Sequence, residues 1–187
     1  MIKFRNLLAD EIECRIQQIN ERGLTLLLYK NARCDMNILD ETVGAENWQR
    51  EHYECKGNLF CRVGINTTWE TYPDDVPGWV WKSDCGAESY TEKEKGEASD
   101  SFKRACVNWG IGRELYTAPF IWIPLNDKNG KPNYKLKEQR PNNKPSTNDK
   151  FAVEKIVITE DKKITGVAIR NITQNKRVFI WSAENGN

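Results

Sequence analysis

The sequence predicts an α+β fold in which an antiparallel three-stranded meander packs on a long helix. A helix–strand–helix segment precedes this core, and a β-hairpin extension follows it. Two patterns favour this class. Apolar and polar residues alternate over 59–65, which is typical of a half-buried strand. Apolar residues recur at spacings of three and four over 98–109, which is typical of an amphipathic helix.

Three elements are expected before the meander. Isoleucines at helical spacing predict a helix over 11–22, which Gly23 ends. The apolar run 24–30 predicts a buried strand. Asp35 is the expected N-cap of a second, short helix that Gly44 ends.

The core follows as three strands and a helix. A turn is expected at Lys56-Gly57-Asn58, and the strands of the meander are expected over 47–55, 59–65 and 79–83. A long helix over about 90–109 comes next and ends at glycines. Residues 117–125 predict one further strand.

The chain is expected to divide into a core domain, a linker and an extension, over 1–125, 126–150 and 151–187. The middle segment is rich in Pro and Asn and has seven basic against three acidic residues, which indicates a basic linker or mobile loop. The extension reads as a hairpin followed by a third strand, over 151–158, 163–170 and 177–181.

Composition excludes some classes of protein. Lys and Arg number 28 and Asp and Glu 27, so the net charge of +1 rules out a uniformly basic coat but allows a local basic groove. No apolar run reaches the length of a membrane span or a signal peptide, so no membrane partner is expected and the cytoplasm is the expected compartment. The six cysteines are irregularly spaced, and we expect reduced thiols.

Motifs for nucleotide and metal chemistry are weak. Gly130-Lys131 lacks the earlier glycine and the following Ser or Thr of a Walker loop, so no nucleotide cofactor is expected. A zinc site could use His52, Cys55, Cys61 and Cys85, but their spacing resembles no familiar ligand pattern, and we expect no metal.

The strongest positive signal lies in the stretch 95–112. Lys103 and Arg104 flank the apolar stripe of the long helix, beside a sheet rich in aromatic residues. Two cations on a packed helix make a fixed phosphate-binding point. The alternative is an ordinary amphipathic helix whose two charges are solvated.

This stretch resembles the signature helix of the Rad52-like single-strand DNA annealing proteins and their phage relatives. The matching pattern is Ser99-Asp100, Phe102, Lys103-Arg104-Ala105 and Trp109-Gly110. A second block over 11–48 has the order of elements that leads into the family's meander. Together the two blocks cover roughly residues 9–115.

The resemblance implies a β-β-β-α core that assembles into rings or open helical multimers. It also implies ATP-independent annealing of single-stranded DNA in recombination and repair, which is not an enzymatic activity. Carried over by position, Lys103 and Arg104 would hold the DNA backbone, and Arg15 on the first helix would contact it from the opposite wall of a groove. Val107 stands where the family commonly has a further Arg, and Thr25 stands near an expected Lys. Lys30, Arg33 or the basic linker would then have to substitute.

The resemblance also implies partners, and two other classes of function stay open. Expected partners are single-stranded DNA, further copies of the chain, an exonuclease and a single-strand-binding protein, in the cytoplasm of a bacterial host that carries the phage or prophage. One alternative is a metal-dependent nuclease that uses Asp74, Asp75 and Glu88. The other is a protein-interaction module without annealing activity.

Overall fold

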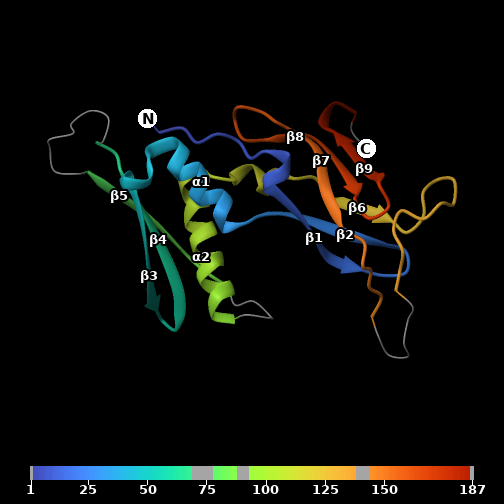
Figure 1. Ribbon diagram of the computed structural model, residues 1–187, viewed down its shortest axis with the longest axis horizontal. Coiled ribbons are helices and arrows are strands. Elements are labelled where there is room, and N and C mark those ends of the chain that lie inside the picture. Colours follow the sequence, from blue (N-terminus) through green and yellow to red (C-terminus); the bar gives the residue numbers. More distant parts are fainter. Residues whose placement is uncertain (1, 69–77, 88–92, 138–143, 186–187) are drawn as a thin grey trace. The chain divides into compact units, whose positions relative to one another are not determined.

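The computed structural model describes residues 2–68, 78–87, 93–137 and 144–185 (Figure 1). In this part of the chain, two α-helices and nine strands in antiparallel sheets confirm the predicted α+β class. The elements are β1 Ile12–Ile19, β2 Gly23–Lys30, α1 Ala32–Val43, β3 Trp48–Cys55, β4 Asn58–Asn66, β5 Trp79–Cys85, α2 Lys93–Trp109, β6 Ile121–Pro124, β7 Phe151–Ile158, β8 Ile164–Asn171 and β9 Lys176–Ser182.

The chain forms two compact units that interleave in sequence. The helical unit comprises Met1–Asn6 and Lys30–Arg113, and the sheet unit comprises Leu7–Tyr29 and Glu114–Asn187. Neither unit coincides with the expected segments 1–125, 126–150 and 151–187.

The helical unit contains the predicted β-β-β-α core. Its sheet has the order β3-β4-β5, and α2 packs on β4 and β5 while α1 packs against α2 (Figure 1). Three alternate residues of β4 face α2 and are completely buried: Cys61, Val63 and Ile65. The apolar residues on the facing side of the helix are also completely buried: Phe102, Ala105 and Cys106. This layer is the hydrophobic core that holds α2 in place.

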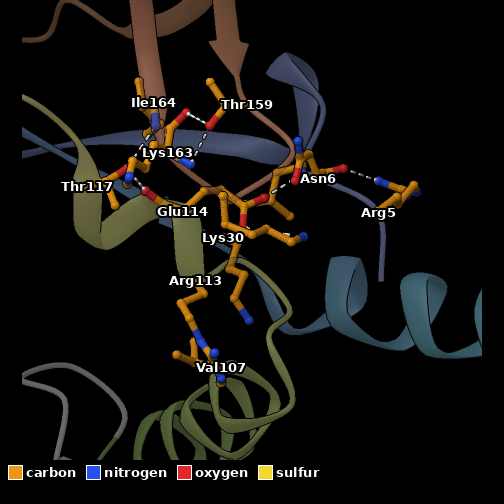
Figure 2. Close-up of polar contacts among 12 residues, drawn as sticks. Arg5, Asn6, Lys30, Val107, Arg113, Glu114, Thr117, Thr159, Lys163 and Ile164 are labelled. Carbon is orange, nitrogen blue, oxygen red and sulfur yellow. Dashed lines mark hydrogen bonds and ion pairs between the residues drawn. The ribbon is translucent and has the colours of Figure 1, made fainter. Parts of the chain in front are cut away.

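The end of α2 is capped by a following side chain. Gly110 and Gly112 adopt positive φ angles of 98° and 71°, which lets the chain leave the helix as predicted. The Arg113 guanidinium then turns back and donates to the Val107 carbonyl oxygen at 3.0 Å, as Figure 2 shows. A cation at this end also complements the helix dipole.

The predicted helix over 11–22 is wrong, because these residues form β1 and the turn into β2. The Asn20 side chain accepts from the backbone N–H groups of Arg22 and Gly23, which stabilises a tight turn between the two strands. Isoleucine is β-branched and suits a strand. β1 also finds a partner far along the chain, since Glu13 lies opposite Ala152 of β7.

The sheet unit is built on one six-stranded sheet of order β6-β2-β1-β7-β8-β9. Its two end strands, β6 and β9, contact each other, so the sheet curls around its own core. The three strands predicted in the extension are present as β7, β8 and β9. The strand expected over 117–125 is shorter, because residues Arg113–Thr117 form a 3-10 turn before β6.

Buried polar contacts fix that 3-10 turn within the sheet unit. Glu114 is completely buried and accepts from the Leu7 backbone N–H at 2.7 Å. The Thr117 hydroxyl accepts from the Ile164 N–H at 2.9 Å (Figure 2). The turn is therefore attached both to the start of the unit and to β8.

The described parts of the segment expected to be a linker or mobile loop are anchored to the sheet unit. Tyr134 is completely buried and packs edge-on against Phe151. The Asn171 side chain donates to the Asn133 carbonyl at 2.9 Å, and Lys176 lies 2.8 Å from Asp127. Residues 126–137 and 144–150 thus belong to the packed structure of this unit.

Candidate nucleic-acid interface

The two cations of the signature stretch lie next to each other on α2. Lys103 is half-buried, with 16 % of its side chain exposed, and its ammonium lies 3.8 Å from Asp100 one turn earlier. Arg104 is 47 % exposed, and its guanidinium Nε lies 3.3 Å from the Asp84 carboxylate on β5. Both are partly exposed ion pairs, which contribute little stability. An incoming phosphate can therefore replace either carboxylate at small cost.

The C-terminal end of α2, about one turn after these cations, is braced by contacts with the sheet. The Trp109 indole N–H donates to the Val63 carbonyl of β4 at 2.9 Å. Lys82 of β5 donates to the Asn108 carbonyl at 2.9 Å and lies over the Trp109 ring. Trp109 therefore packs between the helix and the sheet. These contacts fix the backbone from which Lys103 and Arg104 extend.

Arg33 is an exposed side chain on the first turn of α1. The predicted N-cap of this helix is wrong: Asn31 is the cap and accepts from the Cys34 N–H at 3.0 Å. Asp35, which was expected at the cap, is instead inside the first turn and completely buried. Gly44 ends the helix as predicted, with φ of 84°.

Lys30 ends β2 and has only 4 % of its side chain exposed. Its ammonium forms an ion pair with the buried Asp35 and also donates to the Lys103 carbonyl oxygen at 3.3 Å. Burial raises the pKa of Asp35 to about 6, although the attraction of Lys30 acts in the opposite direction. The structure thus brings Lys30 and Lys103 together, but with the Lys30 charge inside the protein.

Arg15 is on a strand, β1, and belongs to the sheet unit, so the prediction that places it on a helix is wrong. Its guanidinium lies 3.0 Å from Glu13 and over the ring of Tyr29, 4.9 Å from the centroid. The other four predicted residues (Lys30, Arg33, Lys103 and Arg104) all belong to the helical unit.

Sequence reasoning missed a third cation beside α2. Arg50 of β3 is exposed and lies over the Phe102 ring, 4.8 Å from its centroid. The same ring stacks on Trp48 at 6.1 Å. The signal was present, because alternation along β3 places Trp48 and Arg50 on the face that meets the helix.

The alternative sites have little support in the described residues. His52 and Cys61 are opposite each other on β3 and β4, but the His52 Nε2 lies 3.0 Å from the Ala98 carbonyl and Cys61 is buried. Within the described ranges no three His, Cys, Asp or Glu side chains are grouped as a metal site would require. The nuclease candidates Asp74, Asp75 and Glu88 lie outside those ranges.

Burial also governs the thiols of the core. It raises the pKa of Cys61 to about 11 and that of Cys106 well above its usual range. Both thiols are therefore protonated at neutral pH and act as small apolar residues of the core. No helix among the described residues is long and apolar enough to span a bilayer.

The helical unit thus places two adjacent cations on a helix that packs on a three-stranded antiparallel sheet. The sequence profile of the Rad52/22 family of double-strand break repair proteins matches residues 5–134, which is more than half of the chain. The chain therefore belongs to this family. Comparisons with curated proteins and with solved structures gave no significant match.

Membership in the family places the chain in DNA recombination and repair. Proteins of the family bind and anneal DNA and self-associate, and they are not enzymes of the usual kind. The matched range includes the meander, both α-helices and the cations that they carry, whereas the strands β7, β8 and β9 lie wholly beyond it.

Proposed function

We propose that this chain binds single-stranded DNA and anneals complementary strands without ATP. Lys103 and Arg104 contact the phosphate backbone from α2, and Arg33 contributes a further phosphate contact from α1. Arg15, on β1 of the sheet unit, is a further proposed phosphate contact. The proposal rests above all on the position of Lys103 and Arg104, two adjacent cations on a helix whose backbone is fixed by the sheet beneath it.

The chemistry needed for annealing is electrostatic. Two complementary strands pair spontaneously once their bases meet, and the obstacles are repulsion between phosphates and structure within each strand. Cations that neutralise phosphates reduce the repulsion and hold the strand extended. No covalent bond changes, so neither a general acid or base nor a metal ion is required.

The partly exposed ion pairs suit this role. The carboxylates of Asp84 and Asp100 keep the side chains of Arg104 and Lys103, respectively, ordered before DNA binds. Since these pairs are worth only about 0–1 kcal/mol each, exchange of a carboxylate for a phosphate is nearly balanced. Binding is then reversible and independent of base sequence, which annealing requires because the strand must later be released.

We propose that the active form is a ring or a filament of identical subunits. Head-to-tail contacts close into rings or continue as helices. The near-zero net charge does not oppose such assembly. The proposed partners, an exonuclease and a single-strand-binding protein, and the proposed setting in the cytoplasm of a phage-carrying bacterium rest on the family resemblance alone.

A strand-annealing assay tests the proposal. Two complementary oligonucleotides with donor and acceptor dyes are mixed with the protein in EDTA and without ATP. We expect energy transfer between the dyes to rise faster with the wild-type protein than with buffer alone. Most of this rate increase should be lost in Lys103→Gln/Arg104→Gln. Absence of acceleration by the wild type would refute the proposal. Cleavage of the oligonucleotides in magnesium, but not in EDTA, would favour the nuclease instead.

A further inference from the structure

The buried pair Lys30–Asp35 links α1 and α2, the two helices that bear cations of the proposed site. Lys30 donates to Asp35 on the first turn of α1 and to the main-chain carbonyl of Lys103 on α2. Arg33 is two residues before Asp35 on the same turn, and Arg104 directly follows Lys103. One ammonium group thus joins the two helix segments that bear the proposed phosphate contacts.

The ammonium of Lys30 is not placed to bind DNA itself. Only 4 % of the Lys30 side chain is exposed, and Asp35 is completely buried. Two of the three N–H donors of the ammonium point to the partners just described. A phosphate could reach this charge only if the helices separated.

The pair is a poor source of stability. The second carboxylate oxygen of Asp35, Oδ2, is buried with no hydrogen-bond partner among the described residues. An ionised carboxylate buried with one oxygen unsatisfied is costly, and apolar side chains of similar volume commonly replace such pairs without loss of stability. What the pair supplies that an apolar pair does not is a directional bond to the Lys103 carbonyl.

We propose that Lys30 is a positioning residue for single-strand binding: through Asp35 and the Lys103 carbonyl it fixes the first turn of α1 against α2, and so fixes Arg33 relative to Lys103 and Arg104. This inference rests on the proposed function. Lys30 then acts through the cations that contact the DNA and makes no phosphate contact itself.

A double-mutant cycle separates these two roles. Lys30→Met/Asp35→Leu replaces the ion pair by apolar side chains, and it is combined with Lys103→Gln/Arg104→Gln. Binding of fluorescent oligo(dT) is measured by anisotropy between 0.05 and 0.4 M salt. The matched control is Lys176→Met/Asp127→Leu, which replaces a Lys–Asp pair of the sheet unit. Melting curves and gel filtration verify that each variant is folded.

The expected loss follows from counterion release. One phosphate contact is worth about fivefold in affinity at 0.1 M salt, and two contacts are worth about 25-fold. We expect Lys30→Met/Asp35→Leu to weaken binding by roughly fivefold to 25-fold. In the Lys103→Gln/Arg104→Gln background the same change should have no further effect, because the two cations relative to which Arg33 is positioned are already absent. The matched control should bind like the wild type.

Two results would overturn the inference while leaving the proposed function intact. One is wild-type binding by the folded Lys30→Met/Asp35→Leu variant. The other is an equal loss in both backgrounds, with the salt slope lowered by about 0.7 each time, which would make Lys30 itself a phosphate contact. If the wild-type protein does not bind oligo(dT) at all, the proposed function fails, and this inference fails with it.

A measurement without DNA keeps the inference testable if the double variant does not fold. Asp35→Asn keeps the shape of the side chain and removes its charge. The Val107 amide donates to the Lys103 carbonyl in the regular pattern of the helix. If Lys30 no longer holds that carbonyl firmly, this hydrogen bond should open more often and expose the Val107 amide to solvent. We expect several-fold faster hydrogen exchange at Val107 in Asp35→Asn, with unchanged exchange in the sheet unit. Unchanged exchange at Val107 would overturn the positioning role.

Discussion

Removal of the two cations of α2 gives the sharpest test of the proposed interface. Lys103→Gln/Arg104→Gln keeps the first two methylene groups and a polar end at each position and removes both charges. Because both cations are in partly exposed ion pairs, the stability of the fold should change by no more than about 1 kcal/mol for each. Any large loss of binding can then be assigned to the interface and not to unfolding.

The size of the effect can be worked out from the salt dependence of binding. Each phosphate contact on a single strand contributes about 0.7 to the slope of log K against log salt. Loss of two contacts lowers the slope by about 1.4 and weakens binding at 0.1 M salt by about 25-fold, or about 2 kcal/mol. Asp100 and Asp84 compete with the DNA for these cations, so we expect a measured change in slope between 0.7 and 1.4.

The measurement is an anisotropy titration of labelled oligo(dT) at several salt concentrations. Lys56→Gln/Lys155→Gln is the matched control, because it removes the same charge from two exposed sites, one in the turn between β3 and β4 and one on β7. An unchanged slope in Lys103→Gln/Arg104→Gln would refute the interface. An equal change in the control would show that binding follows total charge and not a particular site.

Three other outcomes are expected. Asp84→Asn removes the carboxylate beside Arg104, so oligo(dT) binding at 0.1 M salt should become up to about fivefold tighter in the same titration. Weaker binding would contradict the idea that this carboxylate competes with DNA for Arg104. Burial raises the pKa of Asp35 from 3.8 to about 6, so between these values the folded protein keeps a proton that the unfolded chain has released. Relative to Asp35→Asn, the wild type should lose about 2 kcal/mol of stability as the pH rises from 4 to 6.5 in urea melts, and parallel curves would exclude this shift. A maleimide at pH 8 should modify the exposed Cys55 before the buried Cys106, because burial raises the pKa of the Cys106 thiol. Peptide mass spectrometry measures both rates, and equal rates would show that the reagent reaches the core.

The meander and α2 could be predicted because their signals are local. Alternation over β4 and the apolar stripe of α2 each reflect one buried face, and the two faces meet in the core. The strand β1 could not be found in this way. Its isoleucines fit helical spacing, and the residue that pairs with Glu13 is Ala152, far along the chain. Pairing between residues so far apart in the sequence overrides the local spacing of the isoleucines.

The arrangement of the candidate residues could be anticipated only in part. Lys103 and Arg104 are recognisable because a Lys-Arg pair flanks a regular apolar stripe. Lys30 looks like the polar end of an apolar strand, and Asp35 looks like a helix cap. Their burial as a pair depends on the packing of α1 against α2, which no local pattern records. The sequence therefore indicates which cations are present but not which of them face solvent.

The few contacts of each subunit link binding to assembly. If Lys103, Arg104 and Arg33 each hold one phosphate, they supply about 3 kcal/mol together at 0.1 M salt, whereas even a millimolar dissociation constant requires about 4 kcal/mol. A single subunit would therefore hold a strand only briefly. Several subunits on one strand multiply the contacts, because each further binding event is intramolecular. The family's self-association is thus the physical condition under which a weak and reversible interface of this kind can retain a strand and still release it to its complement.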